Sequence, residues 1–232
     1  MIKFKKYTSN DVYSTKYFIY TYNNNFSKLV KLKSCRNKDF ETAKINSKKI
    51  NKEEVERISL SRTKKNIKEI ALCNNFDYFV TFTINSLSCD RFCLIDCQTK
   101  LKKMLKSYKR KSNNFAYLII TEKHKDGAFH FHGLCKGFLS SDLYINKNGY
   151  ISSFHFDKLG FNSFSEIKDY NRCCNYITKY ISKDCVKNEK NQIYICSRGL
   201  KRADKVELNL INDGNIKWDY KNDYCCIKNI KK

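Results

Sequence analysis

Two short groups of residues in this chain have the types and spacing that phosphate chemistry needs. His130 and His132 are separated by one apolar residue, and Tyr176 and Tyr180 lie four positions apart in the run YITKYISK. Residues two apart share a face of a strand, and residues four apart share a face of a helix. The histidine pair can therefore hold a metal ion, and the tyrosine pair can attack a phosphate.

The histidines fall in the second strand of a predicted hairpin. The segments FAYLIITE (115–122) and AFHFHGLC (128–135) have the apolar and β-branched density of strands, and a short polar stretch joins them. His130, His132 and Leu134 would share one face of the second strand, and Phe131 and Gly133 the other. Two imidazoles are too few for a tight site, so a further ligand must come from the neighbouring strand.

The turn decides which side chain can be that ligand. With Asp126-Gly127 as a two-residue turn, Lys125 pairs with Ala128 and the Glu122 carboxylate leaves the histidine face. With a three-residue loop over residues 125–127, built as a type I turn with Gly127 left-handed in a bulge, Glu122 lies directly opposite His130. Both turns suit the sequence, and only the second completes a site.

We therefore predict a metal site made by His130, His132 and Glu122, with His124 as an alternative ligand or supporting group. Two nitrogens and a carboxylate with open positions suit Mg²⁺ or Mn²⁺ bridging to a phosphate, and the set would also accept Zn²⁺. The competing interpretation is that the histidines only line a polar sheet face.

The tyrosine helix presents cations beside its two phenols. On a helical wheel, the residues within about 60° of Tyr176 are Arg172, Lys179, Tyr180, Lys183 and Lys187. A phenol with a pKa of about 10 is a poor nucleophile, and adjacent positive charge favours the phenolate. We expect Tyr176 and Tyr180 to be nucleophiles, assisted by Lys179 and Lys183. The competing interpretation is chance pairing, because the chain has 16 tyrosines.

The composition indicates a polyanionic partner. Lys and Arg total 46 against 23 for Asp and Glu, a net charge of +23. Such a field attracts a phosphate backbone, although A/T-rich codons also favour lysine. An anionic membrane surface is the rival, but there is no apolar run of about eighteen residues and no secretory signal. We expect a soluble protein of a bacterial cytoplasm.

The 12 cysteines include the trio Cys89, Cys93 and Cys97 but no C-x-x-C. Reduced structural cysteines are the preferred interpretation, and zinc binding by the trio is the alternative.

Helices and strands alternate in an order that predicts an α+β fold. We expect a central antiparallel β-sheet with helices packed on one face. The expected helices are 51–73, with Asn51 as N-cap, then 90–109 and 165–187; the expected strands outside the hairpin are 16–22, 28–32, 76–84, 150–156, 192–196 and 206–211. The expected division is a basic N-terminal appendage (1–50), a main domain (51–190) and a β-rich extension packing on that domain (191–232).

In order, FVTFT, E-x7-HFHG and YITKYISK resemble the three motifs of the HUH endonucleases, the rolling-circle replication initiators of small phages and plasmids. The paired tyrosines look most like the microvirus-type initiators. The resemblance covers about residues 77–187. It implies a ferredoxin-like or RRM-like palm whose central strands carry the first two motifs, with the tyrosine helix beside them.

The resemblance also implies an activity. Tyr176 or Tyr180 would attack single-stranded origin DNA, forming a 5′-phosphotyrosyl link and a free 3′-hydroxyl, and later rejoin the strand without ATP. Thr81 and Thr83 would bind DNA or support the metal face, and Arg172 and Lys187 would contact DNA. None of the seven glycines lies in a G-x-x-x-x-G-K-[ST] motif, so a host helicase would unwind the duplex and a host polymerase would copy it.

Two rival functions stay open. The first is a transposase or relaxase of the same chemistry, which His124 as a third histidine keeps in view. The second is a non-catalytic RRM-like protein that stacks bases on Phe79, Phe82, Phe129 or Phe131. That protein would explain the charge and the aromatic residues, but not the histidine cluster or the tyrosine helix.

Overall fold

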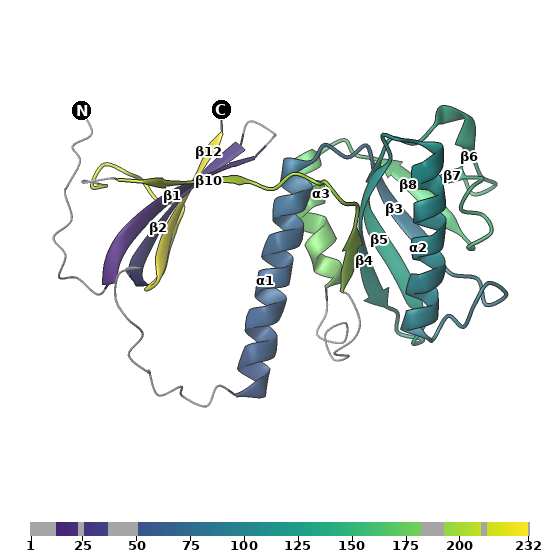
Figure 1. The fold of residues 1–232 in the computed structure, drawn as a ribbon, viewed down its shortest axis with the longest axis horizontal. Helices are drawn as coiled ribbons and strands as arrows, with labels where there is room; N and C mark the ends of the chain where they lie inside the picture. The colour runs from purple at the N-terminus through teal and green to yellow at the C-terminus, as the bar shows by residue number, and fades with distance from the viewer. Residues whose placement is uncertain (1–12, 23–25, 37–50, 182–192, 210–212, 232) are drawn as a thin grey trace. The chain divides into compact units, whose positions relative to one another are not determined.

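A computed structural model of the chain describes residues 13–22, 26–36, 51–181, 193–209 and 213–231 (Figure 1). The chain divides into two compact units. Residues 51–201 form one, and residues 1–50 together with 202–232 form the other. Each unit contains its own antiparallel sheet, which confirms the predicted α+β class. No helix among the described residues is long and apolar enough to span a membrane.

The unit of residues 51–201 is built on a seven-stranded sheet in the order β6-β7-β8-β3-β5-β4-β9. The strands are β3 (Tyr78–Thr83), β4 (Ala116–Lys123), β5 (Phe129–Lys136), β6 (Leu143–Ile145), β7 (Ile151–Ser153), β8 (Asn162–Glu166) and β9 (Tyr194–Cys196). The helices are α1 (Lys52–Cys73), α2 (Leu94–Lys111) and α3 (Tyr170–Tyr176), with short 3₁₀ turns η1 (Ser140–Asp142) and η2 (Ile177–Tyr180).

The predicted helix α1 is confirmed together with its cap. Asn51 precedes the helix, and its side chain accepts a hydrogen bond from the Glu53 amide at 3.3 Å. This bond satisfies one of the backbone donors that a helix N-terminus leaves free, and Glu53 and Glu54 complement the helix dipole.

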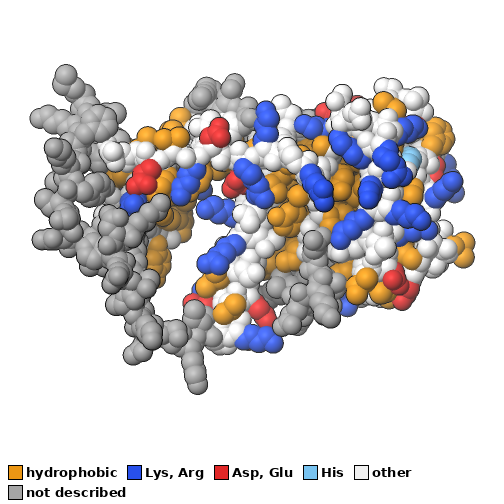
Figure 2. Space-filling model, viewed as in Figure 1, with side chains coloured by type: hydrophobic (Ala, Val, Ile, Leu, Met, Phe, Trp, Pro, Cys, Tyr) orange, Lys and Arg blue, Asp and Glu red, His pale blue; other side chains and the backbone are white. Residues whose placement is uncertain are grey.

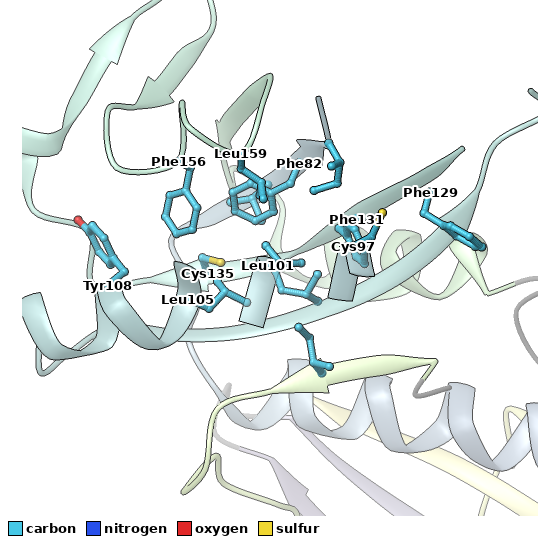
Figure 3. Close-up of a cluster of buried hydrophobic side chains, with 14 of the residues drawn as sticks. Phe82, Cys97, Leu101, Leu105, Tyr108, Phe129, Phe131, Cys135, Phe156 and Leu159 are labelled. Carbon is cyan, nitrogen blue, oxygen red and sulfur yellow. The ribbon is translucent and has the colours of Figure 1, made fainter. Parts of the chain in front are cut away.

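Helix α2 packs on one face of the central strands and forms the main core (Figure 3). Its Leu101 and Leu105 are fully buried against Phe82 and Phe131. Tyr108 closes one end of this core, where its hydroxyl donates to Asp142 at 2.8 Å. The apolar periodicity of the α2 sequence is thus accounted for by packing on the sheet.

The other face of the same strands is covered by α3 and η2, so the expectation that helices pack on one face only is wrong. Phe79 and His132 project from this face and contact Tyr180, at ring-centroid distances of 6.0 and 4.1 Å. Helix α1 joins α3 there, because the Tyr170 hydroxyl donates to the Ala71 carbonyl at 2.7 Å. Side chains alternate along a strand, so two covered faces follow from two covering layers.

The tyrosine helix begins later than predicted. Residues 165 and 166 still belong to β8, where Glu166 pairs with Tyr78. The helix starts after its N-cap Asp169, whose side chain accepts from the Arg172 amide at 2.9 Å. It changes to 3₁₀ geometry at Ile177, and residues 182–187 lie outside the described part.

The second unit contains a five-stranded sheet in the order β10-β1-β2-β12-β11. Its strands are β1 (Tyr13–Tyr22), β2 (Phe26–Arg36), β10 (Asp204–Leu208), β11 (Tyr220–Lys221) and β12 (Cys225–Lys231). The strands predicted at 16–22 and 28–32 are present. However, residues 202–232 group with the N-terminal strands, not with the main domain as expected, because β10 pairs with β1 and β12 with β2.

Candidate active site

The β4–β5 hairpin has the register that places Glu122 beside the histidines. The His124 amide donates to the Ala128 carbonyl at 2.8 Å, and the Gly127 amide donates to the His124 carbonyl at 2.9 Å. Residues 125–127 therefore form a three-residue loop, and Gly127 has the left-handed φ of 90° that this loop requires. Glu122 lies directly opposite His130, as the second of the two alternative turns predicted.

A threonine from β3 holds each histidine ring. Thr81 pairs with His132 and Thr83 with His130 across the β3–β5 ladder. The Thr81 hydroxyl lies 3.1 Å from His132 Nδ1, and the Thr83 hydroxyl lies 3.3 Å from His130 Nδ1. Both contacts use Nδ1 and leave the two Nε2 atoms for other partners. The threonines therefore orient the imidazoles, as groups behind metal-binding histidines usually do.

His132 is engaged with Glu122. Its Nε2 lies 2.7 Å from the carboxylate Oε2. Burial lowers the pKa of His132, although the Glu122 carboxylate opposes this shift, so we assign the neutral imidazole at pH 7 despite the short contact. The tautomer that carries its proton on Nε2 satisfies Glu122 and Thr81 together. Neutral imidazole is also the form that binds metal ions.

His130 is paired with His124 instead. Their rings stack with centroids 4.3 Å apart, and burial lowers the pKa of His130, with His124 and His132 adding to the effect. Within the described ranges, no three His, Cys, Asp or Glu side chains already converge as a metal cage, the cysteine trio included. The predicted set matches a divalent cation in donor type and sheet face. In this structure its donors are engaged as two pairs, so a cation would have to displace the bond between His132 and Glu122.

The two tyrosines meet on this face of the sheet. The Tyr180 hydroxyl donates a hydrogen bond to the Tyr176 hydroxyl at 2.7 Å. The Tyr180 ring stacks on His132 with centroids 4.1 Å apart, while Tyr176 is 43% exposed. The tyrosine pair and the histidine pair therefore lie in one site, with Tyr180 against the histidines and Tyr176 open to a ligand.

Phe79 is a site residue that the sequence reasoning did not assign to the metal and tyrosine site. Its ring contacts Tyr176 at 5.7 Å, Tyr180 at 6.0 Å and His132 at 6.2 Å between centroids. It forms the apolar floor on which the two phenols pack. The alternation of FVTFT could have identified it, since Phe79, Thr81 and Thr83 share one face of β3.

The environment of Tyr180 does not favour its phenolate. Burial raises the pKa of Tyr180, and the hydrogen bond to Tyr176 and the Glu122 charge raise it further. This direction is opposite to the one expected from neighbouring lysines. Lys179 lies near the other phenol, with its Nζ 5.4 Å from the Tyr176 ring centroid.

The remaining predicted residues are only partly placed. Arg172 is exposed on the first turn of α3, four residues before Tyr176. Lys183 and Lys187 lie outside the described residues. The fourth histidine, His155, contacts the Met104 carbonyl of α2 and takes no part in the site.

Comparison with known proteins relates this site to DNA replication. Searches of curated proteins and of solved structures return no match. Residues 77–185, which include β3, the β4–β5 hairpin and both tyrosines, match the model of one protein family. That family is described as Replication-associated protein ORF2/gene 2 protein, a family of phage replication initiators, and it is to these proteins that this part of the chain is similar.

Proposed function

We propose that the protein initiates rolling-circle replication by nicking single-stranded origin DNA with a tyrosine. The observation that carries the proposal is the joining of the two pairs. Two phenolic hydroxyls 2.7 Å apart lie beside a histidine that is itself 2.7 Å from a carboxylate. The family match of residues 77–185 supports a role in replication, and the net charge of +23 suits a DNA substrate.

In the proposed reaction, a tyrosine Oη forms a bond to the scissile phosphorus and the bond from phosphorus to the 3′-oxygen breaks. The phenol loses its proton, and the departing 3′-oxygen gains one. The products are a 5′-phosphotyrosyl link and a free 3′-hydroxyl, which can prime synthesis. Rejoining is the reverse attack by a 3′-hydroxyl, so no ATP is needed.

Tyr176 is the better candidate for the first attack. It is the more exposed phenol, and its oxygen receives the hydrogen bond that Tyr180 donates. A donor aimed at the oxygen stabilises negative charge there, and the Lys179 ammonium lies on the same side. Tyr180 is then the candidate for the second attack, which would release the copied strand.

His130, His132 and Glu122 would hold a divalent cation, Mg²⁺ or Mn²⁺, with His124 in reserve. When bound, the cation would polarise the phosphate and offset the negative charge of Glu122. Thr81 and Thr83 would keep the ring nitrogens turned toward it. Arg172, Lys183 and Lys187 would contact the DNA backbone, and a host helicase and polymerase would act on the opened origin.

The test is formation of a covalent adduct. Oligonucleotides tiled across the replicon that carries the gene are incubated with protein and Mn²⁺ and resolved on denaturing gels. A 3′-end label should remain on the protein, and a 5′-end label should appear on a shorter free strand. We expect Tyr176→Phe to reduce the first adduct strongly, Tyr180→Phe to retain it, and the double variant or added EDTA to abolish it.

Tyr224→Phe is the matched control, because Tyr224 is 79% exposed and lies in the other unit. Wild-type protein that binds these oligonucleotides but yields no adduct with any of them would show that the protein is a binder, not a nuclease.

A further inference from the structure

A second set of exposed aromatic residues lies on the site's face of the sheet. Phe161 precedes β8, and its carbonyl accepts from the Thr83 amide at 2.8 Å. Ser163 pairs with Thr81, so Phe161, two residues earlier, has the same parity and the same face. Thr83 contacts His130, which makes Phe161 the neighbour of the histidine pair on the β8 side.

The backbone holds Phe161 in this place. A Cβ on Gly160 would lie 2.2 Å from the Thr83 carbonyl, so only glycine allows the chain to pass this close to β3. Phe161 is 44% exposed, and its ring meets the ring of Tyr150, which is 52% exposed, edge to face at 6.3 Å. Two exposed rings fixed by their backbone form a surface on which a planar group can stack.

A cavity of about 400 Å³ adjoins these rings, and we call it the β6–β8 cavity. Its lining includes Phe161, Tyr144, Asn146, Lys147, Asp157 and Asn162. The volume is in the range of small-ligand pockets, and the lining combines aromatic walls with a few polar groups. Figure 2 shows basic and hydrophobic side chains side by side at this end of the unit.

Asp157 offers a fixed acceptor in this cavity. Its Oδ1 accepts from the Tyr144 hydroxyl at 2.9 Å and from the Asn162 amide at 2.9 Å. Those two donors hold the carboxylate, and within the described ranges no hydrogen bond uses its second oxygen, Oδ2. An ionised carboxylate only accepts hydrogen bonds, so its ligand must donate. The amino groups of adenine, cytosine and guanine are donors of this kind, whereas thymine has no amino group.

Taken together, these features point to a single occupant. We propose that the β6–β8 cavity binds one unpaired, amino-bearing base of the DNA strand that crosses the tyrosine site, with Phe161 as its stacking partner and Asp157 as its hydrogen-bond acceptor. Lys147 lies at the cavity to meet the flanking phosphates. The inference rests on the proposed function for its substrate, and it adds a residue-specific reading of sequence beside the nick.

The position suits one continuous strand of DNA. The sheet order from the histidines to β6 is β5-β3-β8-β7-β6, four strand spacings or about 19 Å. Phe161 lies between these ends. A single strand running across the sheet can therefore reach the tyrosines and the cavity a few nucleotides apart.

The test is a binding measurement that needs no cleavage. Fluorescence anisotropy is recorded in EDTA with the Tyr176→Phe, Tyr180→Phe double variant as the parent protein. The probes are labelled thymidine oligonucleotides that carry one adenine, cytosine, guanine or abasic site at each position in turn. The parent should prefer an amino-bearing base at one position and lose affinity when that position is abasic.

Phe161→Ala should weaken binding about five- to a hundred-fold, as expected for one lost base stack, and Phe161→Trp should restore it. Phe161→Leu shows whether an apolar side chain without a π-face is enough. Asp157→Asn keeps an acceptor for Tyr144 and Asn162, and it should remove the preference over thymine without lowering overall affinity. Ile95→Ala is the control, because Ile95 is 59% exposed on α2, the layer that covers the opposite face.

Binding by Phe161→Ala at parental affinity would refute the stacking role, and a preference that survives Asp157→Asn would refute the acceptor role. The adduct assay separates this proposal from the nuclease proposal. An adduct formed by wild type with unchanged binding by both cavity variants overturns only the cavity. A cavity-dependent base preference without any adduct overturns only the nuclease.

Discussion

The two faces of strands β3 and β5 are built from alternate residues of the same segments, yet they have opposite properties. On the α2 face, Val80, Phe82 and Phe131 are at most 1% exposed. On the other face, the threonines of β3 are hydrogen-bonded to the histidines of β5, and the α3 layer above them is thin enough to leave Tyr176 43% exposed. The apolar face fixes the register, and the register alone then determines which polar groups meet.

The largest expected difference between the faces is in stability. Phe82→Ala removes a fully buried ring and should cost about 3–5 kcal/mol of unfolding free energy. Phe79→Ala, three residues earlier on the half-buried face, should cost less and should impair adduct formation more, because Phe79 supports both tyrosines. Urea unfolding and the adduct assay on both variants measure the two effects. Equal stability losses would contradict the division of labour between the faces.

A smaller effect is expected from the threonines. Thr81→Val and Thr83→Val keep the side-chain shape and remove the hydroxyl that orients each histidine. We expect Mn²⁺ affinity to fall by about 10- to 100-fold, with little change in stability. Isothermal titration with Mn²⁺ measures this change, and Thr15→Val in the other unit, whose hydroxyl bonds a backbone carbonyl, is the control. Unaltered affinity in both site variants would show that the threonines have another role.

The smallest effect is expected from shortening the hairpin loop. Deleting Lys125 leaves Asp126-Gly127 as a two-residue turn and keeps His124 opposite Ala128. Glu122 then stays opposite His130, so adduct formation should persist and the unfolding free energy should change by less than about 1 kcal/mol. Loss of the adduct with the fold intact would mean that the loop, and not the apolar face, controls the register.

Local patterns predicted much of this structure. The Asn51 cap, strand β3 and the β4–β5 hairpin depend on neighbouring residues, and all three are present. The hairpin register required choosing between two turns, and Gly127 in the left-handed conformation confirms the choice that placed Glu122 correctly.

Features that depend on distant segments were missed. Residues 165 and 166 have polar side chains suited to a helix start, but pairing with β3 keeps them in a strand. The grouping of residues 202–232 with the N-terminal strands has no local signature, since it arises from ladders such as Tyr17 with Leu208. The raised pKa of Tyr180 likewise comes from burial by the fold and not from the lysines that sequence spacing brings near.

The five-stranded sheet of β1, β2, β10, β11 and β12 has a consequence for biosynthesis. Its first two strands leave the ribosome before the unit of residues 51–201, and their partners leave after it (Figure 1). Domains tend to fold as units during synthesis, so the tyrosine unit can fold while β1 and β2 still have unpaired edges. Closure of the sheet must wait until translation has passed β12, and a ribosome stalled shortly after residue 201 would present a folded nuclease-like unit with an open, aggregation-prone pair of strands.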